Sequence, residues 1–205
     1  MLAGPGIPGI DILVAQGELI NRAAGVPEAV IEMNARVQST LADIAKEEPD
    51  PEKAGPLMRS AMREEIALLP QAIMELIPES QINDVAINTT VNQFNSPWFR
   101  FFLHYDPRPV LEQVSVPVLA IFGEKDLQVP HELNVPEIEA AFERGNNEAA
   151  TVRVLPGLNH LFQKAESGAP SEYQQIEETF NQSALELVSS WILKQFTSPK
   201  LDTLS

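Results

Sequence analysis

The sequence predicts an α/β protein with a parallel sheet and a long helical region ahead of its main strands. Residues 10–113 read as helices interrupted by prolines, whereas residues 114–198 alternate strand, helix, strand and helix. The strand that opens the second region is continuously apolar, which is typical of a strand buried on both faces of a parallel sheet. We expect residues 1–9 to form the end of a core strand and a turn, and residues 199–205 to form a tail.

Composition narrows the class of protein. The 205 residues are enough for one domain, and 29 acidic against 14 basic residues give a net charge of −15. Such a charge argues against binding to nucleic acid or to an anionic membrane surface. The chain has no cysteine, which excludes disulfides, thiolate metal sites and a cysteine nucleophile. No membrane-spanning run or targeting signal is recognisable, so we expect a soluble protein and leave its compartment open.

The helical region starts with two predicted helices. Asp11 suits a helix beginning, where a carboxylate meets exposed amides, and Gly25 suits an end just after residue 24. Pro27 fits the first turn of the next helix. That helix has an apolar residue at every third or fourth position: Val30, Met33, Val37, Leu41 and Ile44.

Further helices follow before the strands. Residues 46–51 end the second helix, and a third has an apolar stripe of Met58, Met62, Ile66 and Leu69 up to Pro70. We expect these methionines to fill the core. Shorter helical pieces are predicted at 71–77 and 80–94, with Ser80 as a cap.

The second region is predicted element by element from the same signals. Val116–Phe122 reads as a buried strand, in which Pro117 is tolerable because it lies near the start, and Ala150–Leu155 reads as a second, parallel strand. A helix at about 136–144 would carry Pro136 in its first turn. The last helix has Ser183 and Glu186 at capping-box spacing, Pro199 at its end and an apolar face. The residues of that face are Leu185, Val188, Ile192 and Phe196.

Two loops that leave these strands carry the candidate chemistry. Asp126 stands four residues beyond the first strand, and His160 five beyond the second. Ligand sites in parallel sheets lie beyond the carboxyl ends of the strands, and adjacent strands are about 4.8 Å apart. An acid and an imidazole in these loops can therefore form a hydrogen bond, which is the supporting half of a nucleophilic triad.

With these loops in place, the chain resembles the α/β-hydrolase superfamily, especially serine esterases, acyl thioester hydrolases and related serine peptidases. The resemblance covers most of the chain and rests on Pro117–Pro130 (PVLAIFGEKDLQVP) and Leu155–Phe162 (LPGLNHLF), supported by Leu2–Gly6 and Ser96–Phe102. It implies that Asp126 is the triad acid, His160 the triad base, and residues 10–113 a helical cap inserted after a core strand. It also implies hydrolysis of an ester, thioester or amide of a small acyl substrate, without a cofactor.

The nucleophile of that family is missing from the sequence. The family serine lies in Gly-x-Ser-x-Gly, and none of the ten glycines flanks a serine at that spacing. Ser39, Ser60, Ser80 and Ser96 fall in the cap region, and Ser115 at the wrong end of its strand. We therefore expect the chain to correspond to the C-terminal part of a hydrolase, without its early strands and nucleophile turn.

Other signals indicate no further site. Gly4–Gly9 matches a dinucleotide-binding pattern, but that pattern needs a strand before it, only three residues precede it here, and two prolines interrupt it. His104 and His131 lack metal-binding spacing with His160, although Glu124 or Asp126 could be combined with His131 as ligands. We expect no metal and no cofactor. An aromatic cluster could line an acyl pocket or pack a cap against the core: Trp98, Phe99, Phe101, Phe102 and Tyr105.

Two functions remain open at this point. The first is an acyl hydrolase in which this chain supplies Asp126 and His160. The second is a non-catalytic interaction protein that retains part of a hydrolase. For the first, an incomplete sheet would expose the apolar edge of the Val116–Phe122 strand, so we expect oligomerisation or aggregation through that edge.

Overall fold

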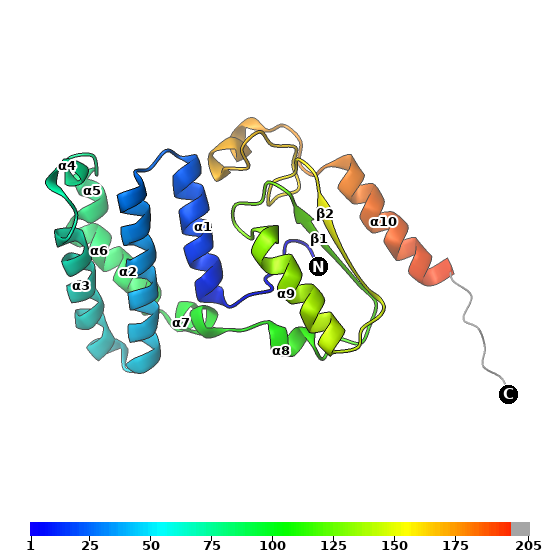
Figure 1. Cartoon of the computed structure of the whole chain (residues 1–205), viewed down its shortest axis with the longest axis horizontal. Coiled ribbons are helices and arrows are strands. Elements are labelled where there is room, and N and C mark those ends of the chain that lie inside the picture. Colours follow the sequence, from blue (N-terminus) through cyan, green and yellow to red (C-terminus); the bar gives the residue numbers. More distant parts are fainter. Residues whose placement is uncertain (198–205) are drawn as a thin grey trace. The chain divides into compact units, whose positions relative to one another are not determined.

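A computed structural model describes residues 1–197 of the chain (Figure 1). Within them, contacts divide the chain into two compact units. The helical unit is Ile7–Pro107, and the strand unit is Met1–Gly6 together with the chain from Arg108 onward. The described residues are mostly helical with a small parallel sheet, so the α/β class is confirmed. The predicted tail 199–205 and the helix end at Pro199 lie outside the described residues.

The helical unit is built from antiparallel neighbours in which α2 packs between α1 and α3 (Figure 1). In chain order its helices are α1 (Gly9–Ala23), α2 (Glu28–Glu47), α3 (Pro51–Ala67), α4 (Gln71–Met74), α5 (Glu79–Ile82), α6 (Asp84–Phe94) and α7 (Pro97–His104).

The long helices follow the sequence prediction closely. Gly25 stands just beyond α1 with φ +73°, the left-handed conformation that ends many helices. The prediction of Ser80 as a cap is wrong, because Ser80 lies inside α5 and Pro78 precedes that helix. Asn83 caps the following helix instead, and its side-chain oxygen accepts a hydrogen bond from the Ala86 amide at 2.9 Å.

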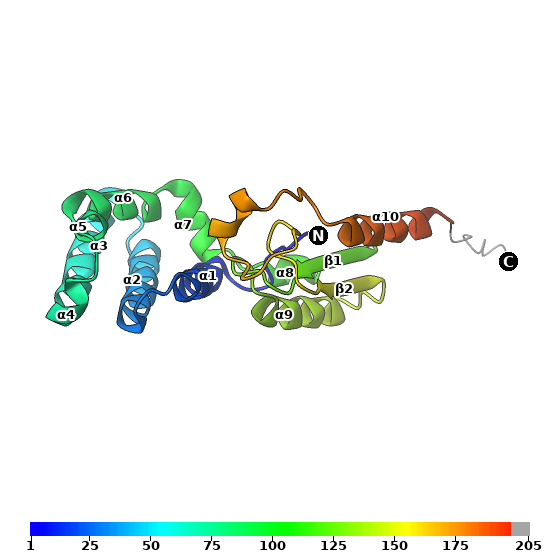
Figure 2. The same ribbon diagram turned by 90° about the horizontal axis from the view of Figure 1, so that it is seen from above.

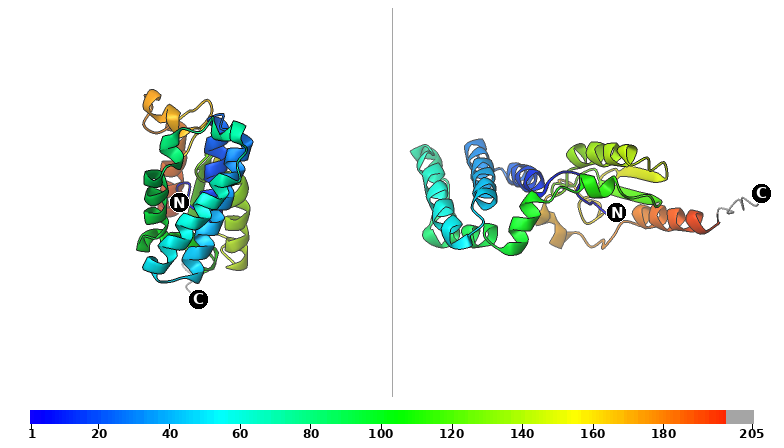
Figure 3. Two further views of the ribbon diagram at one scale, coloured as in Figure 1. Left: turned by 90° about the vertical axis from the view of Figure 1, so that its left-hand side faces the viewer. Right: turned by 90° about the horizontal axis from the view of Figure 1, so that it is seen from below.

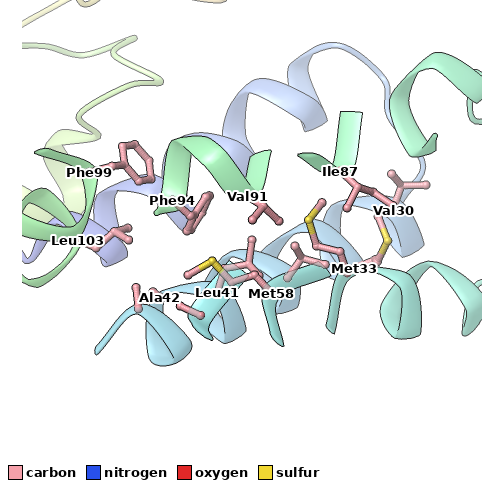
Figure 4. Close-up of a cluster of buried hydrophobic side chains, with 14 residues drawn as sticks. Val30, Met33, Leu41, Ala42, Met58, Ile87, Val91, Phe94, Phe99 and Leu103 are labelled. Carbon is pink, nitrogen blue, oxygen red and sulfur yellow. The ribbon is translucent and has the colours of Figure 1, made fainter. Parts of the chain in front are cut away.

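One apolar core holds the helical unit together (Figure 4). The predicted stripe of α2 supplies four of its buried residues, and the methionines of α2 and α3 are buried beside them, so their role as core filler is confirmed. Leu41 and Met58 have no exposed surface. The buried members are Val30, Met33, Val37, Leu41, Ala42, Ala45, Ala54, Met58, Met62, Ile87, Val91, Phe94, Phe99 and Leu103.

The aromatic cluster forms helix α7, which the sequence did not predict. Ser96 caps it by accepting a hydrogen bond from the Phe99 amide at 3.3 Å. Phe99 is buried in the core of the helical unit, while Trp98 and Phe101 are exposed. Trp98 stacks on Phe102 with ring centroids 5.4 Å apart. Part of the cluster therefore packs the unit, and part faces outward.

The helical unit begins and ends at neighbouring points. The amide of Gly9, at the start of α1, donates a hydrogen bond to the carbonyl of Tyr105, just beyond α7, at 3.1 Å. The backbone of Phe102 lies so close to Gly9 that a side chain at Gly9 would collide with its carbonyl oxygen. The chain thus returns, after almost 100 residues, to the place where it entered the unit.

The strand unit contains two paired parallel strands. Its elements are α8 (Arg108–Leu111), β1 (Val118–Gly123), α9 (His131–Arg144), β2 (Ala150–Leu155), the 3₁₀ helix η1 (Pro170–Gln175) and α10 (Gln182–Thr197). Val118 pairs with Ala150 and Gly123 with Leu155, so the predicted parallel pairing is confirmed. Both strands end in the same register, and the loops that follow them start side by side.

The segment Met1–Ala3 runs along the other side of β1. Leu2 forms a parallel bridge with Ile121, whose amide donates to the Met1 carbonyl at 3.0 Å. The Ala3 amide donates to the Ile121 carbonyl at 2.8 Å. The expected exposed edge of the Val116–Phe122 strand is therefore covered in part, since β1 has neighbours on both sides at Ile121. Oligomerisation or aggregation through this edge stays a prediction.

Helices α9 and α10 lie on opposite sides of the strands (Figures 2 and 3). The prediction that α9 starts near residue 136 is wrong, because it begins at His131 and contains Pro136 in its interior. Pro130 directly precedes the helix, and its φ of −60° suits a helix start as well as Pro136 would. Asn134 on this helix is fully buried, and its side-chain oxygen accepts a hydrogen bond from the Gly6 amide at 2.7 Å.

Helix α10 forms as predicted, but its details differ. The predicted capping box is wrong, since Ser183 lies within the helix and its amide donates to the side chain of Asn181 at 3.0 Å. Three of the four predicted apolar positions are exposed, and Phe196 is 83% exposed. Ala184 at the start of the helix is fully buried. Its first turn is therefore packed, while most of its apolar face remains uncovered in this structure.

Candidate functional site

The two loops at the carboxyl ends of β1 and β2 bring Asp126 and His160 together. The Nδ1 atom of His160 lies 2.9 Å from the Oδ2 atom of Asp126. The two residues are 34 positions apart in the chain, so the contact depends on the parallel pairing of the strands. The side chain of Asp126 has no exposed surface, and that of His160 is 28% exposed.

The second carboxylate oxygen of Asp126 is held by its own loop. Oδ1 accepts hydrogen bonds from the amides of Gln128 and Val129, both at 2.8 Å. These bonds satisfy the buried carboxylate and fix its rotamer. An ionised carboxylate only accepts, so Nδ1 of His160 donates whenever Asp126 is ionised, and in a neutral imidazole Nε2 is then the nitrogen that can accept a proton. The arrangement can orient an imidazole and stabilise its charged form.

Gly123, the last residue of β1, permits the close approach of the two loops. A side chain at this position would collide with the carbonyl oxygens of Leu158 and Asn159. The amide of Lys125 donates to that same Leu158 carbonyl at 2.9 Å. The loop that carries His160 therefore passes directly over the end of β1, which brings its imidazole within reach of Asp126.

Asn159 shapes the turn that follows His160, a role that the sequence reasoning missed. Asn159 is fully buried, and its Oδ1 accepts from the amides of Leu161 at 2.9 Å and Gln163 at 3.0 Å. Its Nδ2 donates to the side-chain oxygen of Gln163 at 3.0 Å. The turn also holds Phe162 at a positive φ of 57°. The signal in the sequence was an asparagine directly before the candidate histidine.

His160 lines a hollow of about 440 Å³ on the strand unit. Its walls are mostly apolar, with Phe162 and Phe180 in contact at 5.3 Å between ring centroids. Thr179 also contributes to this lining. The lining residues are Leu2, Ala3, His160, Leu161, Phe162, Gln163, Thr179 and Phe180.

The serines considered as nucleophiles do not join Asp126 and His160 within the strand unit. Ser39, Ser60, Ser80 and Ser96 belong to the helical unit, in α2, α3, α5 and at the start of α7. Ser115 precedes β1, at the amino end of the sheet. A strand of this length spans roughly 20 Å, which separates Ser115 from the loops at the other end.

The other two histidines belong to other elements of the chain. His104 ends α7 in the helical unit, and burial lowers its pKa, with smaller lowering by Lys46 and Arg100 and an opposite effect of Asp43. His131 begins α9, and its Nε2 lies 3.3 Å from the carboxylate of Glu132. Among residues 1–197, no group of three histidine, cysteine, aspartate or glutamate side chains is placed to hold a metal ion.

Comparison of the chain with models of protein families, with curated proteins and with solved structures found no match in any of the three. The resemblance to α/β hydrolases therefore rests on the motifs quoted above. In the part of the chain described, no helix has both the length and the apolar composition that a crossing of the bilayer requires.

Proposed function

We propose that the chain supplies the acid and the base of a Ser-Asp-His triad that hydrolyses carboxylic esters or related acyl bonds of a small substrate. One observation carries the proposal, namely the 2.9 Å contact between His160 Nδ1 and a fully buried carboxylate oxygen of Asp126. The fixed second oxygen of Asp126 adds support. A buried, oriented carboxylate behind a partly exposed imidazole is the arrangement that general-base catalysis needs.

Each group has a defined task in this proposal. Nε2 of His160 takes the proton of a serine hydroxyl as its oxygen attacks the acyl carbon. Asp126 holds the ring through Nδ1 and stabilises the resulting positive charge. The same proton then passes from Nε2 to the leaving oxygen, nitrogen or sulfur, which leaves an acyl-enzyme. In the second half of the reaction a water molecule attacks the acyl-enzyme and gives its proton to Nε2 of His160. The carboxylic acid is then released, and the proton returns to the serine oxygen.

We also propose that the helical unit corresponds to the cap of this family. Its position in the chain supports that assignment, because Ile7–Pro107 interrupts the path between Met1–Ala3 and β1, which are joined by a parallel bridge between Leu2 and Ile121. Its separate apolar core is consistent with an insertion that folds on its own contacts.

The experiment must account for the nucleophile. The reading frame upstream of Met1 is inspected for Gly-x-Ser-x-Gly, and the product that contains it is assayed with p-nitrophenyl esters and a fluorophosphonate probe. We expect serine labelling and turnover, with His160→Ala and Asp126→Asn each reducing kcat by roughly 10³-fold or more. His131→Gln is the matched control, because it removes another histidine of the strand unit and should leave kcat unchanged.

The proposal fails if the frame contains no such serine, or if the longer product turns over esters at the same rate with and without His160. Loss of activity in the His131→Gln control as well would indicate a general folding defect rather than a triad.

A second candidate function is that of a non-catalytic interaction protein. The exposed apolar residues of α10 favour it, since Leu193 is 62% and Phe196 83% exposed. Under this alternative the purified chain folds cooperatively and shows no ester turnover. Turnover that is abolished by His160→Ala would contradict it.

A further inference from the structure

Three successive side chains after β1 all contact the loop that carries His160. This loop, residues 156–176, leaves β2 and ends in η1. Asp126 binds His160 itself, while Glu124 and Lys125 bind the loop on either side of it. The three contacts are thus spread along the loop rather than concentrated at the histidine.

Glu124 contacts the loop ahead of His160. Its Oε2 accepts a hydrogen bond from the Gly157 amide at 2.8 Å, and its own amide donates to the Leu155 carbonyl at 2.9 Å. Glu124 is exposed, so the bond to Gly157 spans the surface between the two loops. It fixes the backbone three residues before His160.

Lys125 contacts the loop beyond His160. Its ammonium donates to the carbonyls of Ala165 at 2.9 Å and Glu166 at 2.7 Å. Charged donors make stronger hydrogen bonds than neutral ones, and here both carbonyls accept from the same ammonium group. Gly168 lies against the Lys125 carbonyl so closely that a side chain at Gly168 would collide with it. The far end of the loop is therefore fixed both by the side chain and by the backbone of Lys125.

We propose that Glu124 and Lys125 are positioning residues for His160, and that together they hold its loop at the distance at which Nδ1 binds Asp126. The inference rests on the proposed function only in treating His160 as the base. Their side-chain hydrogen bonds run to backbone groups of the loop. Each acts through the backbone, one before the histidine and one after it, so that rotation or lift of the loop would have to break one of these contacts.

The test observes the imidazole directly and needs no turnover. The chain contains three histidines, so ¹⁵N-histidine labelling gives three sets of ring signals, and His160→Gln assigns one of them. The exchange rate of the Nδ1 proton with water reports its hydrogen bond to Asp126. We expect Lys125→Met and Glu124→Ala each to raise that rate by about fivefold, the effect of one typical net hydrogen bond.

Matched variants separate positioning from general stability. Lys125→Arg keeps several donors for the two carbonyls, and Glu124→Gln keeps an acceptor for Gly157, so both should restore the parent rate. Lys164→Met removes a charge from the same loop without removing the donor to Ala165 and Glu166, and should leave the rate unchanged. The thermal midpoint of each variant is recorded in parallel.

An unchanged Nδ1 exchange rate in folded Lys125→Met or in Glu124→Ala overturns the proposal. If Lys125→Met does not fold, the test rests on the exchange rate of Glu124→Ala, because Glu124 is exposed, and Glu124→Gln is its control. A failed esterase assay leaves this measurement untouched, because the ring proton is observed whether or not a serine is present. Loss of the proposed function and loss of the positioning role are therefore distinguishable.

Discussion

The side chain of Asn134 joins two segments of the strand unit that are 128 positions apart. Its Oδ1 accepts from the Gly6 amide at 2.7 Å, and its Nδ2 donates to the Pro130 carbonyl at 2.8 Å. Asn134 has no exposed surface. A single buried amide thus ties the segment that follows Met1–Ala3 to the first turn of α9.

Replacing Asn134 by leucine should destabilise the protein. Leucine has the same branching but is bulkier, and it leaves the Gly6 amide without its acceptor; an unsatisfied buried group costs about 1–3 kcal/mol. The free energy of unfolding in urea measures the loss. Glu139→Gln on the exposed side of α9 should change it by less than about 0.5 kcal/mol. Equal effects of the two substitutions would mean that the bond to Gly6 contributes nothing.

Asn159→Ala should release the turn beyond His160. The substitution leaves the Leu161 and Gln163 amides without their acceptor, at a cost of about 1–3 kcal/mol in the free energy of unfolding. His160 should also lose its fixed position, visible as a changed ¹⁵N signal of its ring. Asn159→Asp keeps both acceptor contacts and loses the donor to Gln163, so its effect should be intermediate. A ring signal that is unchanged in Asn159→Ala would contradict this role.

Gly123→Ala should move the two loops apart. The new methyl group would collide with backbone carbonyls, which cannot rotate away as a side chain can, and overpacking of this kind costs about 1–3 kcal/mol. Gly17→Ala provides the contrast, because that residue lies inside α1 and its added carbon meets only the flexible Gln38 side chain. Alanine is favoured in helices by up to about 1 kcal/mol, so Gly17→Ala should be neutral or stabilising. Equal thermal midpoints for the two variants would refute the steric role of Gly123.

Acid should loosen the loop that follows His160. The Glu172 carboxylate accepts hydrogen bonds from the amides of Ser167 at 2.7 Å and Glu166 at 3.1 Å, and also binds the Ser167 hydroxyl. The Ser167 hydroxyl bond is the largest influence that lowers the pKa of Glu172 below its ordinary value of 4.5. The folded loop therefore prefers the ionised form, and its stabilisation is present above pH 4.5 and lost as the pH falls through the lowered pKa.

Amide hydrogen exchange at Ser167 measures this dependence, after correction for the intrinsic effect of pH. We expect protection to decrease below pH 4.5 in the parent chain. In Glu172→Gln the protection should be weaker near neutral pH and no longer change over that acidic range. A parent-like pH profile in Glu172→Gln would assign the effect to another carboxylate.

The core of the helical unit and the exposed face of α10 should respond very differently to truncation. Leu41 has no exposed surface, so Leu41→Ala should cost about 2–5 kcal/mol. Phe196 is 83% exposed, and Phe196→Ala should leave the free energy of unfolding almost unchanged. Urea unfolding of both variants tests the contrast. A large loss in Phe196→Ala would show that α10 is covered in solution.

Local patterns were enough to predict the parts of the fold that depend on neighbouring residues. The apolar spacing in α2 identified its buried face, and the order of strand and loop placed Asp126 near His160. The start of α9 was predicted wrongly because Pro136 suits a first helical turn, whereas the helix starts directly after Pro130. Packing decides between them, since the buried side chain of Asn134 belongs to the turn that precedes Pro136.

The contacts around the candidate site were beyond a local pattern. The bond from Lys125 to Ala165 joins residues 40 positions apart, and that from Glu124 to Gly157 joins residues 33 apart. In the sequence alone, these charged residues look like the solvated side chains of any surface loop. Their partners are backbone groups, which carry no signature of residue type, so only the folded register of the two loops identifies them.

The hydrogen bond between Gly9 and Tyr105 has a consequence for how this chain can vary. Because residues close to the two ends of the helical unit are adjacent, the unit is inserted in the chain at a single point. A cut at these two points could be closed by a short turn, and the entropic cost of closing a loop grows only slowly with its length. Helices of different number or length could therefore be exchanged here while the strands, and the two loops beyond them, keep their order.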